Sequence, residues 1–140
     1  MRLRKFRVRA YRCIHDSGEI KVGDLAAFVG RNESGKTTIL QALTLLNRDE
    51  IVSELDLCDE LSEELKGEIR LAEGEFELNS NEIRLLKQSF PGLTEMKKIK
   101  LFRNNKKQKV QYEFEDIQIS EETDRGLNSW ENFSKQILNF

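Results

Sequence analysis

The segment "FVGRNESGKTTILQAL", residues 28–43, decides the expected fold of this 140-residue chain. Within it, four residues separate Gly30 from Gly35, which is followed directly by Lys36 and Thr37. Glycines at this spacing before a lysine and a hydroxyl residue are typical of a loop that wraps around phosphate groups. The segment therefore predicts a phosphate loop (a Walker A motif), provided that the flanking sequence supplies a strand before it and a helix after it.

Both flanks have the required pattern. "LAAFV" (residues 25–29) is a short continuous apolar run, as expected of a strand buried on both faces. From Lys36 onward the apolar residues recur at helical spacing, and they are Ile39, Leu40, Ala42, Leu43 and Leu46. The glycine loop is therefore predicted to lie between a buried strand and a helix.

The residue types in the loop suit ATP bound together with Mg²⁺. Gly30 and Gly35 lack a Cβ, so the main chain can curl until successive N–H groups surround an anion. The helix adds the positive end of its dipole. Lys36 is expected to contact the β and γ phosphates, and the Thr37 hydroxyl to bind Mg²⁺. The predicted ATP-binding residues in this stretch are Gly30, Arg31, Asn32, Glu33, Ser34, Gly35, Lys36, Thr37 and Thr38.

The residues before the loop predict a β-hairpin. An alternating pattern predicts a first strand with one buried and one solvated face. The expected buried residues are Phe6, Val8 and Ala10, and the solvated ones are Arg7, Arg9 and Tyr11. Residues 16–18, "DSG", predict the turn, with His15 as a turn residue beside it. The strand is then expected to return through residues 19–22, "EIKV".

Beyond the first helix the pattern is weaker. Residues 49–66 fit either a surface helix or an irregular loop, and the helix would place Ile51, Leu55 and Cys58 on one face. Residues 68–78, "EIRLAEGEFEL", predict a strand.

Three further elements are predicted toward the end of the chain. Residues 80–90 predict a helix capped by Ser80 or Asn81. Apolar residues alternate on both sides of "RNNKKQK" (residues 103–109) and predict a hairpin; they are Ile99, Leu101, Val110, Tyr112 and Phe114. Residues 127–140 predict a second amphipathic helix.

Charge is segregated along the chain, although the net charge is only −2. Residues 1–12 and residues 97–109 carry bases and no acid, whereas residues 49–64 carry acids and no base. Such basic strips are either solvated strand faces and hairpin tips or contacts for nucleic-acid phosphates.

The composition excludes several classes of protein. A chain with 38% hydrophobic and 34% charged residues is typical of a soluble globular domain. No apolar run approaches the roughly 20 residues of a membrane span, and no secretory signal is apparent, so a cytoplasmic location is expected. Cys13 and Cys58 are isolated and are predicted to be buried. With a single histidine, acyl-transfer and zinc chemistry have no candidate residues.

Residues 6–46 resemble the N-terminal lobe of the ABC-type ATPases of DNA metabolism. These include RecF, the SMC and SMC-like proteins, and the OLD (overcoming-lysogenisation-defect) ATPase-nucleases with their phage-defence relatives. Such proteins open with a β-hairpin, enter the loop through V-G-x-N-x-S-G-K-[ST]-[ST], and continue into a helix whose early residues include Ala-Leu. The matching residues are Val29, Gly30, Asn32, Ser34, Gly35, Lys36, Thr37, Thr38, Ala42 and Leu43.

The resemblance implies an α/β fold: an ABC-type P-loop NTPase N-terminal lobe with antiparallel β-hairpins, a few helices and an incomplete sheet. It implies one lobe over residues 1–140, with the hairpin, loop and first helix in residues 1–47 and a variable continuation in residues 48–140. Arg12, at the end of the first strand, is then expected near the nucleotide, and Asn32 lines the loop. Glu33 replaces a glycine common in ABC proteins and is closer to the OLD and defence branch.

Two motifs of these relatives are missing. The Walker B strand, a run of aliphatic residues that ends in Asp-Glu, has no counterpart, since Ser53 and Glu54 interrupt "IVSELD" (residues 51–56). The Leu-Ser-Gly-Gly signature is replaced by "LSEE" (residues 61–64). Phosphoryl transfer depends on charges placed around the phosphate. The chain is therefore expected to bind ATP but not to hydrolyse it efficiently alone. The resemblance implies that a C-terminal lobe or a second ATPase head completes the site, and that DNA and a nuclease are further partners. No membrane contact is expected.

Two alternatives remain open. A small P-loop kinase has a similar size, but such kinases usually place the loop at the start of the chain and add an Arg-rich lid; a phosphotransfer assay separates the two. The other alternative is a nucleic-acid-binding module that uses the basic strips. Tyr112 and Phe114 would then stack on bases, although their strand spacing favours core positions.

Overall fold

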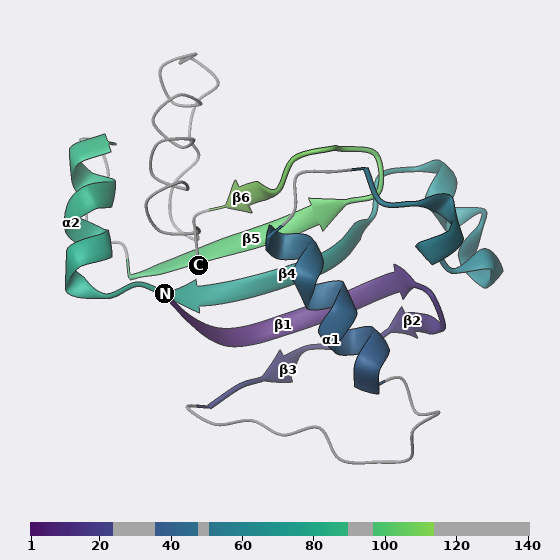
Figure 1. Ribbon diagram of the computed structural model, residues 1–140, viewed down its shortest axis with the longest axis horizontal. Coiled ribbons are helices and arrows are strands. Elements are labelled where there is room, and N and C mark those ends of the chain that lie inside the picture. The colour runs from purple at the N-terminus through teal and green to yellow at the C-terminus, as the bar shows by residue number, and fades with distance from the viewer. Residues whose placement is uncertain (24–35, 48–50, 90–96, 114–140) are drawn as a thin grey trace.

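The computed structural model describes residues 1–23, 36–47, 51–89 and 97–113 (Figure 1). Within these ranges a six-stranded antiparallel sheet has the order β2-β1-β4-β5-β6, and β3 also pairs with β1. The strands are β1 (Arg2–Tyr11), β2 (Ile14–Asp16), β3 (Ile20–Lys21), β4 (Arg70–Glu77), β5 (Lys98–Asn104) and β6 (Gln111–Glu113). The helices are α1 (Lys36–Thr44) and α2 (Ser80–Ser89), with the short 3-10 helices η1 (Leu45–Asn47), η2 (Glu54–Asp56), η3 (Asp59–Leu61) and η4 (Glu64–Lys66). The expectation of antiparallel hairpins with few helices is confirmed.

One face of the sheet forms the core beneath α1. The register places Phe6, Gly74 and Leu101 in one row across β1, β4 and β5. Figure 1 shows α1 crossing the sheet over β1 and β4, and Ala42 on α1 is fully buried. The helix beginning at Lys36, the strand in residues 68–78 and the hairpin around residues 103–109 are confirmed as α1, β4 and β5–β6. Hydrophobic periodicity predicted these elements because each buries one face against the same core.

The opposite face of the sheet carries alternating charges. In the register, Lys5 on β1 lies opposite Glu75 on β4, which in turn lies opposite Lys100 on β5. Glu75 Oε1 is also 3.3 Å from Lys98 Nζ. Opposite charges on adjacent strands stabilise a sheet. The acidic residues of β4 are therefore explained by the basic strands on either side.

The first hairpin turns earlier than the sequence predicts. Tyr11 pairs with Ile14, so the two-residue turn is Arg12-Cys13 and not residues 16–18. Arg12 has φ of +51°, as a type II′ hairpin turn requires at its first central position, where glycine is the usual residue. The prediction of the turn was wrong because an arginine stands where a glycine would have signalled it.

The early turn changes the assignment of the residues that follow. His15, predicted in a turn, lies in β2, and Cys13, predicted to be buried, is exposed in the turn, whereas Cys58 is buried as predicted. Gly18, with φ of +65°, lies between β2 and β3, which both pair with β1. The predicted return strand is therefore β3, reached through an additional strand.

Tyr11 also departs from the predicted alternation, since it is only 4% exposed and not on the solvated face. The preceding residue, Ala10, has φ of +50° and is buried as well. A positive φ in a strand breaks the two-residue period of the side chains. Consecutive residues at the end of β1 therefore both enter the core.

Residues 51–66 are irregular, which decides between the two alternatives for this region. They contain three single-turn 3-10 helices, η2 to η4. Ile51 is 65% exposed and Leu55 is 93% exposed, whereas Cys58 is buried. These three residues therefore share no buried helical face, and the surface-helix prediction was wrong.

The cap of α2 is Asn79 rather than Ser80 or Asn81. Asn79 Oδ1 accepts a 2.9 Å hydrogen bond from the Glu82 N–H, and Glu82 Oε2 accepts one of 2.8 Å from the Asn79 N–H. This reciprocal pair is a capping box, in which two main-chain donors at the helix start are satisfied at once. Glu82 also accepts a hydrogen bond from the Met1 ammonium group, which ties α2 to the start of β1.

We expect Asn79→Ala to lower the free energy of unfolding by about 1 kcal/mol, the usual cost of losing an N-cap side chain. Urea unfolding followed by circular dichroism measures the change. Asn81→Ala is the matched control, because Asn81 is exposed and lies inside the helix. Equal unfolding midpoints for the two variants would contradict the capping role.

Besides residues 30–35 of the predicted phosphate loop, three predicted features lie outside the described residues. They are the buried strand in residues 25–29, the helix in residues 127–140, and Phe114 at the end of the second hairpin. Among the residues that are described, no helix combines the length and apolarity that crossing a membrane would take.

Candidate functional site

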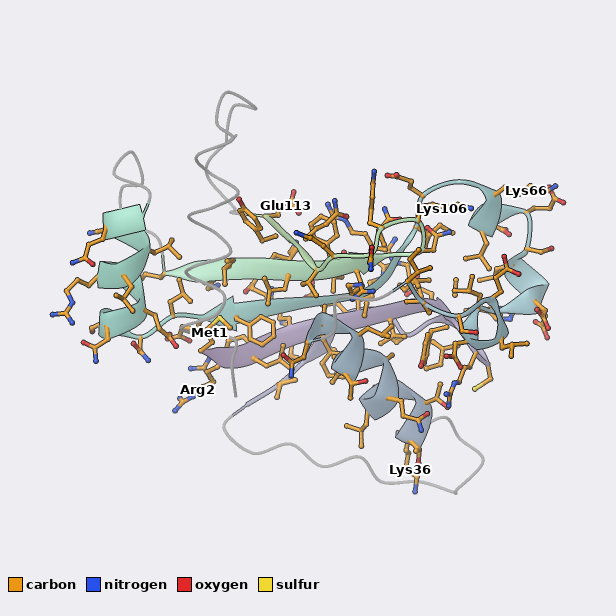
Figure 2. All side chains as sticks on the ribbon, turned by 45° about the horizontal axis from the view of Figure 1, so that its top comes forward. Met1, Arg2, Lys36, Lys66, Lys106 and Glu113 are labelled. Carbon is orange, nitrogen blue, oxygen red and sulfur yellow. The ribbon has the colours of Figure 1, made fainter. Side chains whose placement is uncertain are left out.

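The predicted ligand site centres on the beginning of α1. Lys36 and Thr37 are the first two residues of this helix, and Thr38 follows in the same turn. Figure 2 shows Lys36 at the outer end of α1, on the side away from the sheet. Thr37 is exposed, and Lys36 and Thr38 are half-buried. The lysine and the hydroxyl are thus placed at the end of the helix that carries the positive pole of its dipole.

The first turn of α1 contains no acidic residue. The first four N–H groups of an α-helix have no acceptor within the helix, and a carboxylate in the first turn would compete with a ligand for them. An anion with several oxygens matches these donors and the Lys36 ammonium group together. Residues 36–38 therefore fit the phosphates of a nucleotide, and Thr37 offers the hydroxyl that a hard cation such as Mg²⁺ accepts as a ligand.

The other predicted loop residues lie outside the described part of the chain. They are Gly30, Arg31, Asn32, Glu33, Ser34 and Gly35. Their roles in the site stay predictions from the sequence.

Arg12 lies beside α1, in the turn that follows β1. Its Nη1 donates a hydrogen bond to Gln41 Oε1 on α1, and its Nε donates one of 3.0 Å to Asp56 Oδ1 on η2. The hydrogen bond to Asp56 raises the pKa of Arg12. The guanidinium group also lies 5.5 Å from the centre of the Tyr11 ring. Arg12 therefore joins the turn after β1 to η2 and to α1, the helix that begins with Lys36.

The backbone around Arg12 is strained and tightly held. Ala10 and Arg12 both have positive φ, a conformation that costs a residue with a Cβ about 1–2 kcal/mol. The Arg12 N–H donates to the Asp56 carbonyl at 2.7 Å, and the Cys58 N–H donates to the Ala10 carbonyl at 3.0 Å. Such strain persists where surrounding bonds over-determine it and is frequent near functional sites.

Sequence reasoning missed several residues that support α1. Gln41 and Asp56, which hold Arg12, are polar residues with no motif around them. Gly74 allows Leu46 to approach β4: a Cβ added at Gly74 would lie 3.0 Å from Leu46 Cδ1. Arg103 on β5 is fully buried, and its Nη1 donates to the Leu45 carbonyl at 3.3 Å. These contacts join residues that are far apart in sequence. The sequence alone therefore shows that residue 103 is basic, but not that it is buried or that it contacts Leu45.

The N-terminal basic strip is largely neutralised by carboxylates. Every basic side chain from Arg4 to Arg12 lies within ion-pair distance of an acid: Arg4 with Glu77, Lys5 with Glu19, Arg7 with Asp16, Arg9 with Glu73 and Arg12 with Asp56. Charges paired in this way are poorly placed to neutralise nucleic-acid phosphates. The strip is thus mainly part of the solvated, charged face of the sheet, as the solvated-face interpretation predicts.

The second basic strip is mixed. Lys98 is paired with Glu75, and Lys107 Nζ lies 3.7 Å from Glu68 Oε1. Arg103, predicted at a solvated hairpin tip, lies instead in β5 with no exposed surface, so that prediction was wrong. Its side chain lies on the core face because it follows Leu101 by two positions in the strand.

One ion pair of the first strip gives a pH-dependent prediction. Hydrogen bonds from Arg7, and a further one from the Gly18 N–H, lower the pKa of Asp16 from 3.8 to about 2. Because the folded-state pKa is depressed, this contribution to stability is present above pH 3.8 and is lost as the pH falls through about 2. We expect Asp16→Asn to lower the urea midpoint slightly at pH 7, since solvent screens the pair. The difference from the parent chain should shrink between pH 4 and pH 2, and a constant difference would contradict the assignment.

Comparison with known proteins adds one finding. Residues 1–139 match a family described as AAA ATPase domain. A search of curated proteins gave no significant match. The family match covers the whole sheet, α1, Arg12 and the predicted loop.

Proposed function

The chain belongs to the AAA ATPase domain family, and on this premise we propose that it is an ATP-binding lobe whose residues 30–38 hold the triphosphate. The family implies ATP as the ligand. We further propose that residues 1–140 act as a single lobe of the ABC type, with residues 1–47 carrying the nucleotide site.

The observation that carries the proposal is the position of Lys36. The Gly-x₄-Gly-Lys-Thr pattern ends where α1 begins, so its lysine and threonine are the first residues of a helix that rests on the sheet. A phosphate loop requires this geometry, because the loop N–H groups and the helix dipole then converge on one anion. A glycine-rich turn without a ligand would give no reason for Lys36 and Thr37 at the helix start.

Each residue of the proposed site has a separate role. Lys36 neutralises charge on the β and γ phosphates as a mobile ammonium group. Thr37 and Thr38 offer hydroxyl groups, with Thr37 as a ligand of Mg²⁺, which would bridge phosphate oxygens and offset their charge. Arg12 is held by Asp56 and Gln41 beside the same helix. Its guanidinium group would then lie near the nucleotide, with Asp56 offsetting part of its charge.

We place the protein among the RecF, SMC and OLD ATPases, acting in DNA metabolism or phage defence in the cytoplasm. The support is the match of residues 29–38 to the loop of that group, together with Arg12 after the first strand. The proposed partners follow from the group: a second ATPase head or a C-terminal lobe that closes over the ATP, and beyond them DNA and a nuclease.

We expect residues 1–140 alone to release no phosphate from ATP above the uncatalysed background. The sequence contains no aliphatic strand ending in Asp-Glu and no glycine-rich signature segment. Catalysis of phosphoryl transfer would need the charges that these motifs supply. A phosphate-release assay with Mg²⁺-ATP measures the rate. If the parent chain hydrolyses ATP and Lys36→Ala abolishes that activity, the prediction is contradicted, because the chain would then contain its own general base.

Nucleotide competition tests the proposed function. A fluorescent ATP analogue is bound to the chain in the presence of Mg²⁺ and displaced by ATP, ADP, AMP or adenosine. We expect the affinity to fall in that order, because the site contacts phosphates and most strongly the β and γ groups. Adenosine that displaced the probe as well as ATP does would contradict a phosphate-centred site.

A further inference from the structure

Arg103 is a charged residue in the core, far along the sequence from the proposed nucleotide site. It lies on β5 with a relative exposure of 0%, and its Cα partner on β4 is the fully buried Ala72. A guanidinium group keeps its proton at any ordinary pH. Burying its charge is unfavourable unless negative groups surround it. The position of this side chain therefore requires a compensating partner within the core.

The C-terminal end of α1 provides such a partner. Arg103 Nη1 donates a 3.3 Å hydrogen bond to the carbonyl of Leu45, the residue directly after the last residue of α1. The last carbonyl groups of a helix have no N–H donor within the helix, and they carry the negative end of its dipole. Arg103 thus binds the negative end of the same helix whose positive end carries Lys36.

A second contact holds the same end of the helix against the sheet. Leu45 and Leu46 are buried, and Gly74 on β4 leaves room for Leu46. A Cβ at position 74 would also lie 3.0 Å from Phe76 Cε2 and 3.1 Å from Leu3 Cδ1. The end of α1 is therefore held by a charge contact on β5 and by close packing on β4, whereas Leu40 nearer its beginning is 49% exposed.

We infer that Arg103 is a positioning residue for nucleotide binding, which sets the orientation of α1 from its far end; this inference rests on the proposed function. Nine helical residues span about 13 Å, so a tilt of about 5° at the anchored end moves Lys36 and the first-turn N–H groups by about 1 Å. Displacements of that size are enough to weaken contacts that depend on aligned donors. Arg103 acts through the helix and does not touch the nucleotide.

The test compares Arg103→Met, Arg103→Lys and Gly74→Ala with the parent chain. Arg103→Met keeps a long side chain without its charge, and Arg103→Lys keeps the charge with fewer donors. Gly74→Ala disturbs the same end of α1 through Leu46 and leaves Arg103 unchanged. Lys100→Met is the matched control, since Lys100 is on the same strand but on the charged face. ATP dissociation constants are measured by calorimetry where urea unfolding shows each variant to be folded, and amide hydrogen exchange of α1 is measured without nucleotide.

We expect Arg103→Met to raise the ATP dissociation constant roughly tenfold or more and to speed exchange of the α1 amides. Arg103→Lys should recover part of both effects, and Lys100→Met should match the parent chain. A residue with a purely structural role would lower the unfolding midpoint but leave ATP affinity unchanged in the folded protein. An ATP dissociation constant for folded Arg103→Met within about twofold of the parent value would overturn the inference.

Two further comparisons distinguish failure of this inference from misfolding of a variant and from failure of the proposed function. If Arg103→Met does not fold, Arg103→Lys and Gly74→Ala decide, and parent-like ATP affinity in both overturns the inference. If the parent chain does not bind ATP, the proposed function fails. Hydrogen exchange of the α1 amides then tests only the claim that Arg103 holds the end of α1. Exchange rates that are unchanged in every Arg103 and Gly74 variant would overturn that claim.

Discussion

Lys36→Ala is expected to weaken ATP binding by at least about 100-fold, because each charge-assisted contact to phosphate contributes about 1.5–3 kcal/mol and Lys36 is proposed to make more than one. The circular dichroism spectrum and the urea midpoint should stay close to those of the parent chain. Lys36 lies at the outer end of α1, and its removal leaves the buried Ala42, Leu45 and Leu46 in place. Isothermal titration with Mg²⁺-ATP measures the affinity.

The matched control is Lys66→Ala. Lys66 is an exposed lysine at the end of η4, apart from α1 (Figure 2). It pairs with Glu63 at 2.8 Å. Its removal changes the net charge of the chain by the same amount and should leave ATP affinity unchanged. Parallel losses in the two variants would indicate a general charge effect. Parent-like affinity in Lys36→Ala would remove the lysine from the site.

The largest expected loss of stability comes from Leu101→Ala. Leu101 is 1% exposed, lies between Gly74 on β4 and Tyr112 on β6 in the register, and belongs to the core beneath α1. Truncating a buried leucine removes apolar contacts and leaves a cavity, which costs about 2–5 kcal/mol. For a lobe of this size such a loss is a large fraction of the typical total stability. Urea unfolding of the two proteins measures the difference.

Leu55→Ala is the control for this prediction, because Leu55 undergoes the same chemical change at 93% exposure. Its effect should stay within about 0.5 kcal/mol. Comparable losses for the two substitutions would contradict the assignment of the core. They would mean that the region around η2 is covered by another part of the protein in solution.

The parts of the fold that the sequence predicts are those set by local periodicity. Phe6 and Val8 on β1, and Ile99 and Leu101 on β5, face the core because side chains alternate along a strand. The start of α1 at Lys36 follows from the change to helical spacing after the glycines. In these cases the neighbours in sequence carry the whole signal, so no knowledge of the three-dimensional arrangement is required.

The features that the sequence does not predict depend on contacts between distant residues or on unusual backbone angles. The sequence suggests that Arg103 is part of a solvated strip, but in the fold η1, which directly follows α1, packs against β5, and Arg103 is buried there. Arg12 occupies a turn position where glycine is expected, held there by hydrogen bonds to Asp56. The Asn79 cap was readable from its three-residue spacing to Glu82, but the neighbouring Ser80 offered an equally plausible local pattern.

The candidate site divides in the same way. The phosphate-loop residues are predicted from their spacing, their flanking pattern and the resemblance, and residues 36–38 lie at the start of α1, where a phosphate loop would place them. The supporting residues Gln41, Asp56, Gly74 and Arg103 carry no motif, because their contribution is to hold α1 and Arg12 in place.

The most direct test of the central claim is a titration of the ¹⁵N-labelled chain with Mg²⁺ and a non-hydrolysable ATP analogue, followed by nuclear magnetic resonance. The account predicts that the largest shifts occur at the backbone amides of residues 30–38, and that Lys36→Ala removes them. Shifts confined to α2 or to the β5–β6 hairpin, or no shifts at millimolar analogue, would contradict it.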